Sequence, residues 1–322
     1  MSHDKIEVNT KAQQPKSVGA GDPSPFATPT LAYDPRSHTK RDSCFWRKLV
    51  KTAISTLQHR GVTGGILKIP YTPFCIKYGH TIQLSEATAL QFVRQATSIP
   101  VPKVYCAFRE KDMTYIVMEK IDGEEIGKGW AERPEAERQS LLQQLRVYFD
   151  ELRSIPHPHP GSVAGAHIQP LWEPRTYKGN LGFGPFANER DFNMFLRYGF
   201  QNDDEILGEG SMMTDEERSE ISRLIRLQDE GKHKTCFTHG DASSSNILVK
   251  KGKVVALIDF EMSGFYPEYW EYANAINVNR FDGFWAREVG KFLHAYPKEV
   301  EMEAIRRKHF GYKGFRGHIM YS

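Results

Sequence analysis

The alternation of apolar and polar positions divides the chain into a strand-rich first part and a helix-rich second part. Apolar residues at helical spacing begin near residue 45 and predict a first helix. A second helix is predicted after Ser85, which we expect to be its N-cap. Four short apolar runs bounded by turn residues predict strands at 65–69, 74–78, 104–108 and 115–119. These elements predict a small sheet with one helix against it.

From about residue 131 the spacing becomes mainly helical. Helices are predicted at 138–153, 189–198, 215–228 and within 269–310, with short β-like runs at 236–239, 247–249 and 254–259. A segment rich in proline, glycine, histidine and aromatic residues, 155–188, separates the first two helices, and loops of this length are usually functional or disordered. We therefore expect an α+β fold with two lobes: a small sheet lobe at 41–121 and a larger, mainly helical lobe at 122–322.

Composition adds limits to this picture. Residues 1–40 have few large apolar side chains, so we expect a disordered N-terminal arm. The chain of 322 residues has a net charge of +3 and no dense run of Lys and Arg, which argues against nucleic acid as a partner. Its four cysteines are scattered, and no apolar segment is long enough to span a membrane. We expect a cytoplasmic protein without membrane attachment or an obligate protein partner.

The strongest chemical signal is the segment His239-Gly240-Asp241, followed by Asn246 and, 13 residues later, Asp259. Phosphoryl transfer from ATP needs a carboxylate to orient and deprotonate the attacking hydroxyl, and oxygen ligands to hold Mg²⁺ on the phosphates. Asp241 suits the first role, while Asn246 and Asp259 suit the second. His239 is another candidate base, but because Asp241 already suits that role, we interpret the imidazole as a hydrogen-bonded strut that shapes the loop.

Two upstream segments could bind the nucleotide. Lys77 follows an apolar strand and Glu86 opens the next helix, as in kinase-like folds where a strand lysine contacts phosphates and a helix glutamate holds it. Lys68, on the preceding strand, is the alternative; we prefer Lys77 because it is nearer the helix. The strand ending at Glu119 then breaks at Gly123, which is typical of a connection between two lobes whose backbone would bind an adenine ring.

With these motifs, the chain resembles the aminoglycoside phosphotransferase and choline kinase superfamily, and is most similar to fungal phosphotransferase-family proteins. The resemblance spans about residues 60–290 and rests on the catalytic loop and on phrases at 75–79, 85–87, 97–105, 115–119 and 266–272. It implies a protein-kinase-like fold that uses ATP and Mg²⁺. It also implies the following roles: Asp241 as catalytic base, Asn246 and Asp259 as metal ligands, Lys77 as phosphate ligand held by Glu86, and Glu119, Lys120 and Ile121 as the adenine-binding hinge.

The expected activity is transfer of the γ-phosphoryl group of ATP to a hydroxyl of a small, amine-bearing metabolite. Glu261, Glu268 and Glu271 are candidates for binding the amine. The alternative is a pseudokinase or ligand-binding module without turnover, because no G-x-G-x-x-G precedes Lys77. A protein kinase is disfavoured, since no Ala-Pro-Glu segment follows Asp259.

Overall fold

The computed structural model describes residues 44–57, 65–176, 182–200, 213–277 and 283–311. The expected N-terminal arm, 1–40, and the glycines at 61 and 64 lie outside these residues. Within the described part, none of the helices combines the length and the apolar character that crossing a membrane requires.

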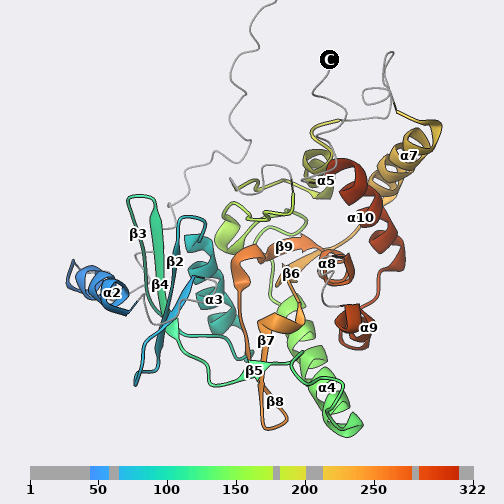
Figure 1. Ribbon diagram of the computed structural model, residues 1–322. Helices are drawn as coiled ribbons and strands as arrows, with labels where there is room; N and C mark the ends of the chain where they lie inside the picture. The colour runs from blue at the N-terminus through green and yellow to red at the C-terminus, as the bar shows by residue number, and fades with distance from the viewer. Residues whose placement is uncertain (1–43, 58–64, 177–181, 201–212, 278–282, 312–322) are drawn as a thin grey trace, which may run out of the picture. The chain divides into compact units, whose positions relative to one another are not determined.

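The first part of the chain forms a four-stranded antiparallel sheet in the order β1-β2-β4-β3 (Figure 1). Its strands are β1 (Ile66–Lys68), β2 (Phe74–Gly79), β3 (Val104–Glu110) and β4 (Met113–Glu119). Two helices accompany it, α2 (Cys44–Leu57) and α3 (Leu84–Ala96). Because side chains alternate along a strand, one face of the sheet packs on α2 through Ile76 and Phe108, and the other packs on α3 through Ala107 and Ile116. Lys77 is consequently on the α3 face.

The second part is mainly helical. Its helices are α4 (Glu135–Arg153), α5 (Glu189–Leu196), α7 (Asp215–Glu230), α8 (Trp270–Asn277), α9 (Gly283–Phe292) and α10 (Pro297–Phe310). Two small antiparallel sheets lie among them (Figure 1). One contains β5 (Glu124–Glu125), β7 (Ile247–Lys250) and β8 (Lys253–Leu257), and the other pairs β6 (Thr235–Thr238) with β9 (Gly264–Pro267). The α+β fold class with a small sheet lobe and a larger helical lobe is confirmed.

Some local predictions differ from the structure. Helix α3 begins at Leu84 with Gln83 as its N-cap, so Ser85 is inside the first turn and is not the cap. The two-residue strand β5 and the strand β9 were not predicted. Both depend on partners far away in the sequence, since β5 pairs with β7 and β9 pairs with β6. Pairing of this kind leaves little periodicity in so short a segment.

Strand pairing changes between Glu119 and Glu124. Strands β1 to β4 pair with one another, whereas β5 pairs with a strand more than 120 residues later. We retain the division into 41–121 and 122–322 as a proposal. Three short 3-10 helices also matter for the site: η2 (Ala166–Ile168), η4 (Ser244–Asn246) and η5 (Phe260–Met262).

Candidate active site

The loop after β6 turns sharply at Gly240. This residue has φ of +83°, and a Cβ atom there would lie 2.4 Å from the carbonyl oxygen of Met262. Only glycine meets both demands, because a side chain is strained at this φ and would collide with backbone. Trp285 of α9 braces the loop by donating from Nε1 to the carbonyl oxygen of Ala242 at 2.9 Å. The backbone therefore holds Asp241 in a defined position.

Asn246 is held directly on Asp241. Its Nδ2 donates to the carbonyl oxygen and to Oδ2 of Asp241, both at 3.1 Å. Because the amide nitrogen is used in this way, Oδ1 of Asn246 is the atom that remains for a metal ion or a ligand. The five-residue spacing seen in the sequence thus corresponds to one hydrogen-bonded pair at the end of η4.

His239 makes three hydrogen bonds to other described residues. Nε2 donates to the carbonyl oxygen of Ile258 at 2.8 Å, and Nδ1 accepts the backbone N–H of Asp241 at 3.2 Å. Its own backbone N–H donates to Glu271 at 2.5 Å. Burial lowers the pKa of His239, so the imidazole stays neutral in this arrangement. We retain the interpretation of His239 as a strut that links the catalytic loop to the end of β8.

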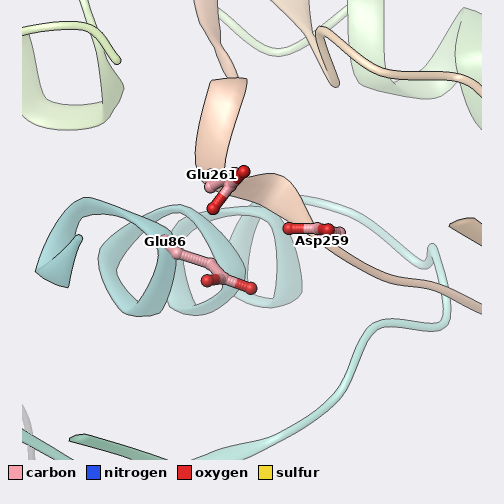
Figure 2. Close-up of side chains that lie close together, drawn as sticks. All are labelled: Glu86, Asp259 and Glu261. Carbon is pink, nitrogen blue, oxygen red and sulfur yellow. The ribbon is translucent and has the colours of Figure 1, made fainter. Parts of the chain in front are cut away.

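A charged cluster joins the sheet lobe to the segment after β8. Nζ of Lys77 lies 2.8 Å from Oε2 of Glu86 and donates to Oδ1 of Asp259 at 2.8 Å. Glu261 is next to this pair, with Oε2 3.7 Å from the same ammonium. Figure 2 shows Glu86 on α3 close to Asp259 and Glu261, which lie on the segment that follows β8. Asp259 adopts a left-handed conformation with φ of +65°, which turns the chain into η5.

The electrostatics of the cluster reflect burial and crowding. Burial raises the pKa of Glu86 to about 7, although Lys77 opposes the shift. Burial, and then the nearby Asp259, raise the pKa of Glu261. Burial lowers the pKa of Lys77, but the carboxylates of Glu86, Asp259 and Glu261 outweigh it and hold the value above the ordinary one. The site thus favours a cation among its carboxylates.

These carboxylates also suit a metal ion. One oxygen each from Glu86, Asp259 and Glu261 lie within 4.8 Å of one another. Hard cations such as Mg²⁺ prefer oxygen ligands, and the crowding of acids supplies the charge that such a cation balances. The Glu86 side chain is only 1% exposed, so the more accessible Asp259 and Glu261, with Oδ1 of Asn246, are the better candidates. The sequence did not indicate Glu261 for this role.

The hinge between the lobes leaves a specific donor free. The N–H groups of Glu119 and Lys120 donate to the carbonyl oxygens of Lys103 and Pro73 at 2.9 and 2.8 Å. Within the described ranges, the N–H of Ile121 has no such partner, so it is available to a planar acceptor such as an adenine edge. Lys68 is exposed on β1, and no bond joins it to the charged cluster in the described residues.

Two of the three acids proposed for an amine are engaged by the protein. Glu271 is buried and accepts the N–H groups of His239 and Gly240; burial raises its pKa to about 7. Glu268 accepts from the hydroxyl of Tyr296 at 3.1 Å and pairs with an arginine of α4. These contacts brace the catalytic loop and the end of β9, so we do not carry Glu268 and Glu271 forward as substrate ligands.

Sequence reasoning missed Arg175 and Glu173. Nη2 of Arg175 donates to the carbonyl oxygen of Gly240 at 2.7 Å, and Nε donates to Oε1 of Glu173 at 2.5 Å. The pair comes from the 155–188 segment, which is anchored by bridges from Val163 to Phe186 and from Leu171 to Phe183. The two charged residues of Glu173-Pro174-Arg175 were the available signal, but the sequence did not indicate that Arg175 would contact the backbone of Gly240.

The sheet lobe pairs a strand lysine with a helix glutamate, and the helical lobe carries a loop with a paired Asp and Asn. This combination is typical of protein-kinase-like phosphotransferases. The sequence matches the model of the phosphotransferase enzyme family over residues 83–306. This is more than half of the chain, which therefore belongs to that family and is a small-molecule kinase. The resemblance drawn from its motifs is confirmed.

Comparison with solved structures agrees with this fold. The chain is similar to the aminoglycoside phosphotransferase APH(4)-Ia, with a TM-score of 0.53 and 15% identity over 82% of this chain and 90% of that chain. It is also similar to APH(2")-IIa in a streptomycin–ATP ternary complex, with a TM-score of 0.50 and 17% identity over 82% and 86%. At such low identities the likeness shows the fold. A search of curated proteins finds no match.

Proposed function

We propose that this protein transfers the γ-phosphoryl group of ATP to a hydroxyl of a small molecule with the help of Mg²⁺. The observation that carries the proposal is the contact of Lys77 with both Glu86 and Asp259, at 2.8 Å each, beside the paired Asp241 and Asn246. Three distant segments supply the charges that phosphoryl transfer uses. The streptomycin–ATP complex of APH(2")-IIa, which shares the fold, supports the choice of nucleotide.

Each residue has a role in the proposed reaction. The backbone at Glu119–Ile121 binds the adenine, and Lys77, held by Glu86, contacts the phosphates. Asp241 orients the acceptor hydroxyl and receives its proton as the oxygen bonds to the γ-phosphorus. The bond from that phosphorus to the β–γ bridging oxygen breaks, and ADP leaves with the electron pair.

Asn246, Asp259 and Glu261 would hold the magnesium. When bound, the ion supplies positive charge against the phosphate oxygens. The protein's own contribution is mainly positioning, because the loop, the strut and the helix hold these side chains before any ligand arrives.

The three acids expected to bind an amine on the acceptor are engaged by other groups of the protein. Glu268 and Glu271 are occupied by protein donors, and Glu261 faces Lys77. We therefore limit the proposal here to a hydroxyl acceptor. A protein substrate is disfavoured, because β9 begins at Gly264 directly after η5 and leaves no room for an activation segment.

The test is ADP release from ATP and Mg²⁺ across a broad panel of hydroxylated small molecules. We expect at least one acceptor to raise ADP release above the level of an Asp241→Asn control. Calorimetric titration with ATP runs in parallel, so that nucleotide binding without turnover is recognised. Binding without ADP release on any acceptor would favour the alternative of a ligand-binding module, and absence of both would refute the proposal.

A further inference from the structure

A cavity of about 520 Å³ opens beside the charged cluster. Its walls include Glu261 from the cluster, Trp172 and Pro174 from the 155–188 segment, and Arg109 at the end of β3. A second cavity of about 280 Å³ is also lined by Trp172 and Arg109. Because they share these residues, the two cavities adjoin and lead from the cluster toward the hairpin of β3 and β4.

The inner end of this path lies beside the charged cluster. Glu261 lines the larger cavity, and its Oε2 lies 3.7 Å from Nζ of Lys77. Pro174 precedes Arg175, whose Nη2 donates to the carbonyl oxygen of Gly240 at 2.7 Å. A molecule that fills the path therefore lies next to the charged cluster and to the segment whose Arg175 contacts the catalytic loop.

The outer end of the path is positively charged. Arg109 is exposed and makes no hydrogen bond or ion pair with any residue in the described part of the chain. Glu261 is the one acid among the described lining residues, and it already faces the ammonium of Lys77. The guanidinium of Arg109 is consequently available for an anion, and its planar fork suits carboxylate and phosphate.

Two uncharged groups of hydrogen-bond donors also favour an anion in the smaller cavity. Helix α3, which is 13 residues long, presents Gln83, Leu84 and Ser85 to the smaller cavity, and its N-cap makes no side-chain cap hydrogen bond. The free N–H groups of such a helix start favour negative charge. Thr114, directly opposite Arg109 across the hairpin, is only 1% exposed and lines the same cavity. Its hydroxyl has no hydrogen-bond partner among the residues that the structure describes.

We propose that these adjoining cavities hold the phosphate acceptor, and that the acceptor carries an oxyanion, a carboxylate or a phosphate, bound by Arg109, Thr114 and the start of α3. The hydroxyl of the same molecule reaches Asp241 at the inner end. This inference rests on the proposed function and deepens it, since it names the acceptor class as a hydroxylated acid. It replaces the amine-bearing acceptor expected from the sequence.

The experiment measures binding of four probes to the protein saturated with ADP and Mg²⁺. Three probes share a six-carbon polyol skeleton and differ in one terminal group: gluconate, glucitol and glucamine. The fourth is inorganic phosphate, which separates a preference for phosphate from a preference for carboxylate. We expect the anionic probes to bind more tightly than glucitol and glucamine. Arg109→Gln should weaken anion binding about tenfold or more, because it removes a charge-assisted hydrogen bond.

A matched control is available on α5. Arg190 is also exposed and without a hydrogen bond or ion pair within the described ranges, but it does not line either cavity. Arg190→Gln should leave every probe unchanged, while Thr114→Val should weaken the anions less than Arg109→Gln does. Unfolding in urea checks that each variant is folded.

Equal anion affinity in wild type and Arg109→Gln overturns the inference, as does tighter binding of glucamine or the absence of binding by all probes. Failure of ADP and Mg²⁺ to bind is a different result, because it counts against the proposed function. The probes are then titrated into the nucleotide-free protein, where the comparison of Arg109→Gln with Arg190→Gln still decides the inference.

Discussion

Replacing Lys77 with methionine would leave the cluster of carboxylates without its ammonium. The lysine side chain is 7% exposed, and Glu86 beside it is 1% exposed. Methionine fills a similar volume but carries no charge, so the loss is mainly electrostatic. Glu86 would then be a buried carboxylate with no cation in contact.

The magnitude follows from burial. Removing one partner of a buried ion pair costs about 3–5 kcal/mol of unfolding free energy, because the other charge stays buried without compensation. Asp259 is 36% exposed and Glu261 20%, so solvent screens them and most of the cost falls on Glu86. We expect Lys77→Met to approach that range at pH 8.

The cost should depend on pH with a definite sign. Burial already raises the pKa of Glu86 to about 7 in the presence of Lys77, and the value rises further without the lysine. The folded variant therefore binds a proton that the unfolded chain, with an ordinary carboxyl pKa of 4.5, has released. Stability of Lys77→Met should consequently fall as the pH rises from 4.5 through the raised pKa.

Urea unfolding of wild type, Lys77→Met, Glu86→Gln and the double variant at pH 6 and pH 8 tests this account. We expect the double variant to recover much of the loss at pH 8, because the Glu86→Gln change replaces the buried carboxylate with a neutral amide. The loss in Lys77→Met should be smaller at pH 6. Equal losses at both pH values, with no recovery in the double variant, would show that packing and not charge explains the effect.

Three further predictions concern the catalytic loop. Asp241→Asn should lower kcat by about 10²–10⁴ with little change in the urea midpoint, because it removes a general base but keeps the partner of Asn246; steady-state ADP release measures it. Gly240→Ala should destabilise the protein by more than about 2 kcal/mol, because the new Cβ would collide with the backbone of Met262. The control is Gly161→Ala, at φ of +92° with open space around it, which should cost only about 1 kcal/mol of backbone strain. Burial raises the pKa of Glu271 to about 7, so its contribution to wild-type stability should fall between pH 4.5 and 7. Urea titrations of Glu271→Gln should lack this contribution.

The sequence predicted the site correctly where functional residues lie close together along the chain. Asp241 and Asn246 are five residues apart and meet in one hydrogen-bonded pair, so local spacing was enough to connect them. The fold class could likewise be predicted, because the sheet and the long helices carry strong periodicity, and the family could be predicted from the catalytic loop and the shared phrases. Preference for Lys77 over Lys68 rested on proximity to the next helix, and the structure brings Lys77, not Lys68, to Glu86.

What escaped prediction depends on contacts between distant segments. Arg175 is 65 residues before Gly240, and Glu271 is 31 residues after it, yet both hold the same turn. Charges on a helix start or in a proline-rich stretch usually face solvent, whereas Glu271 is buried and the Arg175 side chain is half-buried. That burial follows from the packing of the whole helical lobe, which the local pattern does not specify.

The balance of charge separates the site from the protein's structural ion pairs. Deep in α10, Arg306 donates from Nε to both oxygens of Glu303, and Nε of Arg307 lies 3.8 Å from the same carboxylate, so the cations there are not outnumbered by carboxylates. Among the described residues, Glu86, Asp259 and Glu261 pair with Lys77 and with no other cation, so three carboxyl groups share one ammonium and carry an excess of two negative charges when all three are ionised. Buried ion pairs contribute little to stability even when they are balanced, and an unbalanced cluster costs more. Stability therefore does not explain the cluster, whereas a divalent cation, which the proposed function requires, would balance its excess charge.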